Sequence, residues 1–191
     1  MSLDDNSAKL DAVRESVQDC RSCQLCDTRT NIVFGDGSAD ARVMIIGEAP
    51  GKNEDLEGRP FVGAAGKLLD ELLEQAGLSR DDIFIANVLK CRPPSNRDPK
   101  PEEIEQCADY LRNQVRAISP EVIVTLGNFA TRFILKTDRG ITSMRGRFYK
   151  TGRFLVFPVF HPAAALYDPT KRETLMDDFS HLGEFLKNGS S

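Results

Sequence analysis

The 191-residue sequence has no apolar run that approaches the roughly 20 residues needed to span a bilayer, and its first twenty residues lack the charged and apolar regions of a signal peptide. We therefore expect a cytoplasmic protein that does not enter a membrane. Cysteine is scarce, with five residues in the chain. A chain of this length buries a core without crosslinks, and a reducing compartment disfavours disulfides, so close-set cysteines indicate metal or redox chemistry.

Positive charge is also in deficit, since 25 lysines and arginines face 29 acidic residues and the formal net charge is -4. This balance argues against bulk electrostatic capture of nucleic acid but leaves room for a local basic face. Basic residues gather in segments expected to be loops: Lys90, Arg92, Arg97, Arg145, Arg147, Lys150, Arg153, Lys171 and Arg172. A basic face and ordinary solvated surface charge are equally compatible with this distribution.

Two common nucleotide-binding motifs, G-x-G-x-x-G and the P-loop, are absent. A glycine-rich stretch, GEAPGKNEDLEGRPFVGAAG, nevertheless follows the first predicted strand and covers residues 47–66. Its glycines let the backbone approach a planar or phosphate-bearing ligand, and residues 63–66 open a helix whose free N–H groups face an anion. Such a loop alone is weak evidence for a nucleotide site.

Short apolar strands alternate with amphipathic helices along the chain, which predicts a largely parallel sheet covered by helices on both faces. The expected strands are 42–47, 82–91, 121–127 and 153–160, and the expected helices between them are 64–78, 100–119 and 128–135. We therefore predict an α/β fold: one domain over 1–191, a three-layer α/β/α sandwich with a mainly parallel four-stranded sheet. An N-terminal helix over 8–19 leads to the first cysteines, and a flexible tail is expected over 187–191.

Polar residues follow the predicted strands, at the edge where ligands bind to such sheets. Glu48, Asn87 and His161 lie at or just beyond strand ends. Taken singly, Asn87 is an ordinary turn former, His161 an ordinary loop residue, and Phe61 an ordinary core residue. Their placement on one edge of the sheet favours a common site.

The cysteines form a pattern of metal-ligand spacing. Cys20 and Cys23 make a C-x2-C pair, and Cys91 and Cys107 follow in a second region, so four thiolates can close one site. The spacing alone does not separate zinc from an iron–sulfur cluster. Cys107 also belongs to an apolar helical stripe in which a small buried thiol is common, and Cys26 is close enough to replace another ligand.

The thiol pair, the GEAPG and PFVGAAG blocks, ANVLKCRPP, Cys107 and FHPAAAL together resemble the type 4 uracil-DNA glycosylases of bacteria and archaea. The resemblance covers nearly the whole chain, with the blocks in the family's order and approximate spacing. It implies a DNA repair enzyme that hydrolyses the N-glycosidic bond of uracil and leaves an abasic site. It also implies one four-iron four-sulfur cluster per chain, held by Cys20, Cys23, Cys91 and Cys107.

The resemblance assigns roles around a flipped-out uracil. Asn87 reads the base, because a carboxamide offers a donor to O4 and an acceptor to N3–H. Phe61 stacks on the ring, and His161 donates to O2, where negative charge grows as the bond breaks. Backbone N–H groups around Gly47 and Gly51 support the same face.

Water activation departs from the best-known uracil glycosylase family, because Ala49 stands where that family has a water-activating aspartate. We expect Glu48 to orient the attacking water or to shape the pocket. If bond breaking precedes attack by water, no strong base is required.

The expected DNA contacts follow His161 in the sequence. Leu166 is the candidate apolar wedge for the gap left by the flipped base. Tyr167 stands where many relatives have an arginine, so we expect Lys171 and Arg172 to supply the missing positive charge. The expected partner is uracil-containing DNA, single- or double-stranded, bound by a monomer.

Two function classes follow. The first is a monofunctional glycosylase, because no lysine in the motif blocks is an obvious Schiff-base nucleophile. The second is a non-catalytic iron–sulfur protein, either an electron carrier or a nucleic-acid-binding accessory. Release of uracil from an oligonucleotide distinguishes them.

Overall fold

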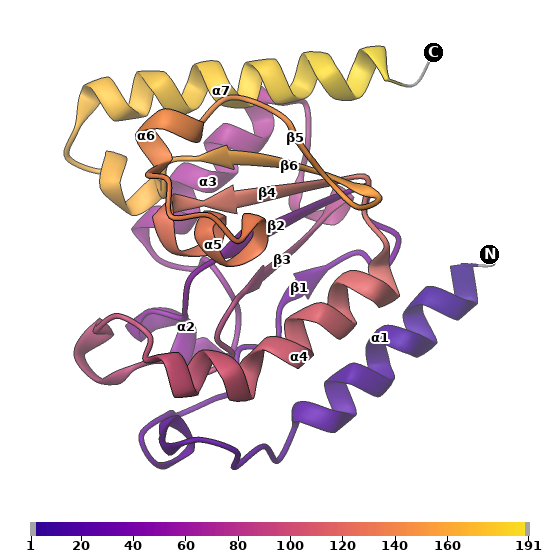
Figure 1. Ribbon diagram of the computed structural model, residues 1–191, viewed down its shortest axis with the longest axis vertical. Coiled ribbons are helices and arrows are strands. Elements are labelled where there is room, and N and C mark those ends of the chain that lie inside the picture. The colour runs from indigo at the N-terminus through magenta and orange to yellow at the C-terminus, as the bar shows by residue number, and fades with distance from the viewer. Residues whose placement is uncertain (1–2, 190–191) are drawn as a thin grey trace.

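The computed structural model describes residues 3–189, in which six strands form one sheet in the order β1-β3-β2-β4-β6-β5 (Figure 1). The strands are β1 Asp36–Gly37, β2 Val43–Gly47, β3 Ile83–Asn87, β4 Val122–Leu126, β5 Tyr149–Thr151 and β6 Phe154–Val159. The four central strands are parallel, and β1 and β5 pair antiparallel at the two edges.

The predicted α/β fold is confirmed, but the predicted number of four strands was wrong. The four expected strands are the central ones. The two additional strands span only two and three residues and are largely accessible to solvent, so they carry no apolar pattern that sequence could reveal.

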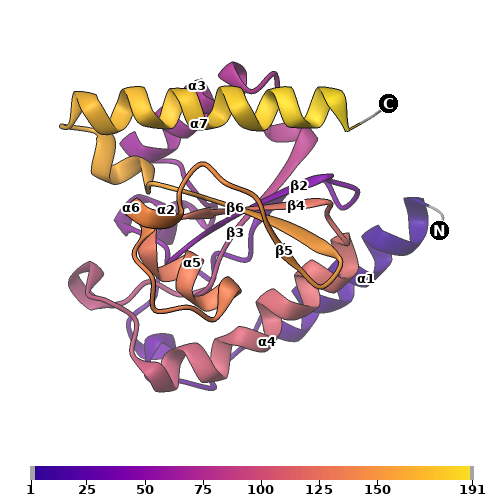
Figure 2. The same cartoon turned by 45° about the horizontal axis from the view of Figure 1, so that its top comes forward.

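Helices cover both faces of the sheet (Figure 2). One layer contains α3 and α7, and the other contains α1, α4 and α5. The helices are α1 Leu3–Val17, α2 Lys52–Glu57, α3 Ala64–Gln75, α4 Pro101–Ile118, α5 Gly127–Leu135, α6 Ile141–Met144 and α7 Pro169–Asn188. None of these described helices combines the length and apolar character that a membrane crossing requires.

Successive residues of the central strands pack into opposite layers. Val43 and Ile45 of β2 join the core beneath α3 and α7, whereas Met44 and Ile46 join the core beneath α1 and α4. Every residue of β2, β3 and β4 is buried. Burial on both faces explains why these strands are continuous apolar runs in the sequence.

The ends of the chain differ from expectation. The N-terminal helix, predicted over 8–19, is α1 and ends at Val17, before the first thiol. Helix α7 was not predicted, although its buried residues recur at helical spacing: Leu175, Phe179, Leu182 and Leu186. The flexible tail was predicted over 187–191; α7 continues to Asn188, and residues 190–191 lie outside the described residues.

Strand register brings the predicted site residues to one edge. Gly47 at the end of β2 pairs with Asn87 at the end of β3, and the end of β4 pairs with Val159 of β6, two residues before His161. The carboxyl ends of four parallel strands therefore meet at the same edge of the sheet.

Candidate active site

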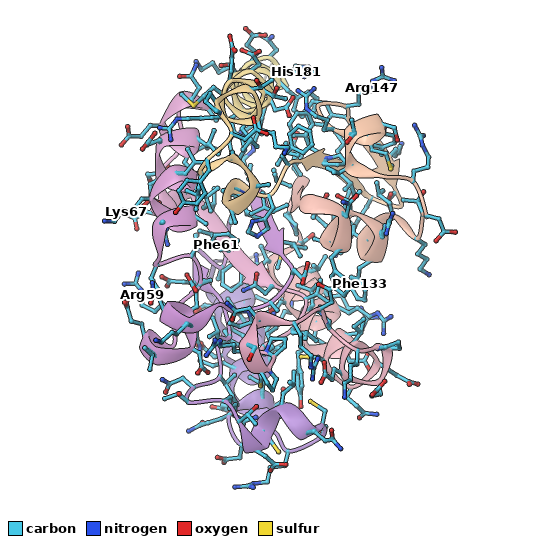
Figure 3. All side chains as sticks on the ribbon, turned by 90° about the vertical axis from the view of Figure 1, so that its left-hand side faces the viewer. Arg59, Phe61, Lys67, Phe133, Arg147 and His181 are labelled. Atoms are coloured by element: carbon cyan, nitrogen blue, oxygen red, sulfur yellow. The ribbon has the colours of Figure 1, made fainter. Side chains whose placement is uncertain are left out.

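A cavity of about 360 Å³ opens at the carboxyl edge of the sheet. Figure 3 looks onto this edge and labels Phe61, which lines the cavity. Five residues predicted from the sequence line it together: Glu48, Gly51, Phe61, Asn87 and His161. They come from four separate segments of the chain, which the fold brings together in one cavity.

Asn87 carries an unsatisfied polar atom in this cavity. The residue is 2% exposed, and its Oδ1 has no hydrogen-bond partner among residues 3–189. A buried acceptor without a donor costs about 1–3 kcal/mol. An N–H group of a ligand entering the cavity would remove this cost.

Two glycines allow the close packing around Asn87 and Phe61. A Cβ at Gly47 would overlap the Asn87 carboxamide oxygen and approach the Phe61 ring to 2.9 Å. A Cβ at Gly66, in the first turn of α3, would overlap the Phe61 carbonyl oxygen. Both positions therefore exclude side chains, and Gly47 lies against both residues rather than in the lining of the cavity.

Phe61 has a strained backbone that a distant arginine supports. Its φ angle is 52°, in the left-handed region that bulky residues avoid. Arg80 donates to the Phe61 carbonyl at 2.6 Å and to the Pro60 carbonyl at 3.3 Å, and it pairs with Asp70 at 2.6 Å. Sequence reasoning missed Arg80, because a charged residue in a polar loop gives no signal of this role.

His161 is held in one tautomer. Its Nδ1 accepts the Ala163 backbone N–H at 3.1 Å, so the proton of the neutral imidazole resides on Nε2. Burial lowers the pKa of His161 to about 4, which keeps the ring neutral at pH 7. The ring stacks on Phe61 with centroids 5.7 Å apart. The arrangement provides a neutral N–H donor beside an aromatic face.

Two carboxylates line the cavity. The predicted Glu48 has its pKa raised by burial and, secondarily, by the Asp98 carboxylate. Glu54 was missed: its Oε1 accepts the backbone N–H groups of Val62 at 2.9 Å and Gly63 at 3.1 Å. Glu54 thus holds the loop that carries Phe61, through contacts that no sequence periodicity reveals.

The predicted DNA-contact residues lie beyond His161, with Leu166 just before α7 and Lys171 and Arg172 in its first turn. Leu166 is half-buried and packs against the core beneath α3 and α7, whereas Tyr167 is 96% exposed. Lys171 pairs with Asp168 at 2.9 Å, and Arg172 pairs with Glu71. Acidic neighbours therefore partly offset both positive charges.

The four predicted thiols line a second pocket, near the end of α1 and against α4. Cys20, Cys23, Cys91 and Cys107 all contribute to it, and Cys26 does not. Among residues 3–189, no three histidine, cysteine or acidic side chains are placed to hold a single metal ion. We refer to this space, defined by its four cysteines, as the thiol pocket.

Positive and polar groups surround the sulfur atoms. An Arg29 N–H lies 3.4 Å from Cys91 Sγ, and the Lys90 backbone N–H lies 3.3 Å from Cys107 Sγ. Burial raises the pKa of the Cys91 thiol to about 11 and raises that of Cys107 as well. These thiols therefore stay protonated at pH 7 unless a bound cation stabilises the thiolates.

The sequence suggested that Lys90 belongs to a basic surface, but the structure places it inside the protein. It is 1% exposed, and burial lowers the pKa of its ammonium to about 8. Lys90 therefore does not contribute to a basic face on the protein surface.

A family model and several relatives of this chain indicate the same superfamily. The family model described as the uracil DNA glycosylase superfamily matches residues 34–186 of this chain. A protein of Archaeoglobus fulgidus named Type-4 uracil-DNA glycosylase is 49% identical over 183 residues, which cover 92% of each chain. Proteins of the same name from Sulfurisphaera tokodaii and Thermotoga maritima are 48% and 42% identical, over 92% and 93% of this chain and 84% and 95% of their own.

Proposed function

Because the chain belongs to the uracil-DNA glycosylase superfamily, we infer that it is a DNA repair hydrolase that removes uracil from DNA and leaves an abasic site. The observation that carries this conclusion is the buried Asn87 oxygen, which has no hydrogen-bond partner in the described part of the chain and lies in a cavity with Phe61 and His161. The N3–H of uracil is the donor that this oxygen needs.

The proposed roles follow from what each side chain offers. Uracil enters the cavity after flipping out of the DNA and stacks on Phe61. Asn87 Oδ1 accepts from N3–H, and its amide N–H donates to O4. His161 donates its Nε2 proton as a hydrogen bond to O2, where charge develops as the bond between N1 and C1′ breaks. Gly51 lets the backbone of the cavity wall approach the base, and Gly47 lets Asn87 and Phe61 pack closely behind it.

The departing base is an anion, and C1′ of the sugar becomes an electrophile. Water adds its oxygen to C1′ and releases a proton, which neutralises the uracil anion. We propose that Glu48 orients this water at the cavity wall. A strong base is unnecessary when bond breaking runs ahead of attack.

One assay separates this enzyme from a non-catalytic iron–sulfur protein. The chain is incubated with an oligonucleotide that carries one uracil, and alkali then cleaves abasic sites. We expect strand scission at the uracil position and none in a matched oligonucleotide with thymine there. Intact uracil strands, in the presence of fully folded protein, would favour the non-catalytic class.

We propose that the thiol pocket holds one four-iron four-sulfur cluster on Cys20, Cys23, Cys91 and Cys107. Four thiols from two chain regions are the usual donor set, and N–H groups near the sulfurs are typical surroundings. When bound, such a cluster supplies iron–thiolate bonds that tie the two regions together and a centre able to change redox state. The hydrolysis proposed above does not depend on that redox chemistry.

Purified protein should contain about four iron and about four sulfide per chain, with visible absorbance. Replacing Cys20 or Cys107 by serine should remove the colour and lower solubility, because one ligand is lost. Cys26→Ser is the matched control, since Cys26 lies outside the pocket lining, and it should keep full iron content. Zinc instead of iron in anaerobically prepared protein would contradict the cluster.

We propose that DNA contacts the start of α7 and the residues just before it, through Leu166, Lys171 and Arg172. Leu166 is the proposed wedge, and exposed Tyr167 lies directly beside it on the same turn. The proposed substrate is uracil in single- or double-stranded DNA. A monomeric state and a cytoplasmic location remain predictions.

The affinity for DNA should fall steeply as the salt concentration rises. The reason is that each protein contact to a phosphate releases a counterion from the DNA, and added salt opposes this release. Replacing Lys171 and Arg172 together by alanine should flatten the plot of log Kd against log salt by about one to two in slope. The double variant Lys9→Ala, Arg112→Ala is the control, since it also removes two surface cations that pair with neighbouring acids. An unchanged slope would mean that other basic residues contact the phosphates. The segment 145–153 would then be the next to test.

A further inference from the structure

Lys90 places a charged side chain inside the protein between the cavity and the thiol pocket. Its Nζ donates to the Asn87 backbone carbonyl at 2.8 Å and to Gln114 Oε1 at 2.6 Å. Gln114 is itself buried and donates to the Phe34 carbonyl at 2.8 Å, so this acceptor of the ammonium is held in place. Burying a charge is costly, and a core of apolar side chains would not need it.

The backbone of Lys90 has different partners from its side chain. The backbone N–H donates to Cys107 Sγ at 3.3 Å, and the carbonyl accepts the Val33 N–H at 2.8 Å. The side chain, in contrast, returns to Asn87, three residues earlier. One residue therefore contacts the thiol pocket through its main chain and the base-reading residue through its ammonium.

The turn between Asn87 and Cys91 has no other side chain that can perform this task. Val88 and Leu89 are fully buried and apolar, and their backbone N–H groups bond to the carbonyls of Gly47 and Glu48. These bonds attach the turn to the end of β2 but leave the Asn87 carbonyl to the Lys90 ammonium. The peptide between Asn87 and Val88 is thus held at its N–H by the Gly47 carbonyl and at its carbonyl by the Lys90 ammonium.

We propose that Lys90 is a positioning residue for base recognition: its ammonium fixes the Asn87 peptide so that the carboxamide faces the cavity at the angle uracil requires. The proposal rests on the function inferred above. A small rotation of the Asn87 peptide would misalign both hydrogen bonds to the base, and misalignments of this size lower rates strongly. In this proposal the Lys90 side chain positions the residue that reads the base, whereas the Lys90 backbone N–H contacts Cys107 in the thiol pocket.

The test uses Lys90→Met, which keeps the length of the side chain and removes the donor. The rate of single-turnover uracil release should fall about tenfold to a hundredfold. The ratio of the rates of uracil and cytosine release should also become smaller. Iron and sulfide content should stay at the wild-type level, because the backbone N–H to Cys107 remains. Thr131→Val is the matched control: it removes a buried hydrogen bond to Thr125 elsewhere in the core, and we expect it to leave the base preference unchanged.

A double-mutant cycle shows whether Lys90 acts through Asn87. In an Asn87→Ala background, adding Lys90→Met should cause no further loss of uracil release. If Lys90→Met misfolds, Gln114→Ala is the alternative, because it removes the second hydrogen-bond acceptor of the ammonium. It should lower uracil release and base preference in the same way, but by less. Losses that multiply in the Asn87→Ala background, or unchanged release in Lys90→Met, would overturn the proposal. Wild-type protein is measured first, because absence of uracil release there would refute the proposed function itself.

Discussion

Replacing Asn87 by aspartate should lower uracil release by at least about a hundredfold, which is the scale of discrimination at a site built around polar contacts. The substitution keeps the size of the side chain and replaces its N–H donor by an acceptor. The O4 of uracil then faces a carboxylate oxygen, and both groups are acceptors. Because the residue at position 87 is 2% exposed, water does not relieve this conflict.

Cytosine provides the internal comparison. It has nearly the same outline as uracil but carries a donor at position 4 and no hydrogen at N3. The small rate of cytosine release should therefore fall much less in Asn87→Asp, or rise. Single-turnover release from matched oligonucleotides, after a check of iron content, measures both rates.

A second amide residue controls for the charge that the substitution adds. Asn113→Asp makes the same chemical change on α4, where Asn113 Oδ1 accepts from Arg116, and uracil release should not change. Equal losses for uracil and cytosine in Asn87→Asp would show that Asn87 does not read the base.

His161→Ala should slow uracil release by about a hundredfold to a thousandfold, the usual cost of removing a donor to a developing oxyanion. The reason is structural: Ala163 occupies Nδ1, so Nε2–H is the donor that remains for O2. DNA affinity should change little, because charge on O2 grows only in the transition state. Replacing the other histidine, His181, which contacts Phe148 and Phe157, should leave the rate unaffected.

The pH dependence gives an independent check on His161. Its folded pKa of about 4 lies below the ordinary value of 6.5, so the ring stays neutral and donating between pH 5 and pH 8. The unfolded chain binds this proton more readily, and stability should therefore fall as pH drops from about 6.5 toward 4. If the plot of uracil-release rate against pH bends near pH 6.5, and this bend is absent in His161→Ala, then His161 is not a neutral hydrogen-bond donor.

The strands, and the edge of the sheet at which Asn87 and His161 lie, were predictable because both follow from simple rules. Buried parallel strands are short apolar runs, and ligands bind where such strands end. Asn87 and His161 could therefore be assigned to one edge before their contacts were visible. The short edge strands β1 and β5 lack any such pattern.

The supporting residues were not predictable, since their roles depend on contacts between distant segments. Arg80 holds the Phe61 carbonyl from another loop, and Glu54 binds backbone groups that lie in no periodic relation to it. Lys90 looked like a surface charge in a loop, because composition does not show which lysine the fold encloses. Tertiary structure decides the burial of such residues.

The separation of the thiols along the chain also has a consequence for biosynthesis. Helix α1 packs against α4, and the thiol that follows α1 lies in one pocket with Cys107 of α4. A ribosome adds about 5–20 residues each second, so Cys20 and Cys23 emerge several seconds before Cys107. During that interval α1 lacks the α4 surface on which it docks, and the two thiols that follow α1 stay open to oxidation. The N-terminal segment must therefore join the nascent protein late, after β3 and α4 have left the ribosome.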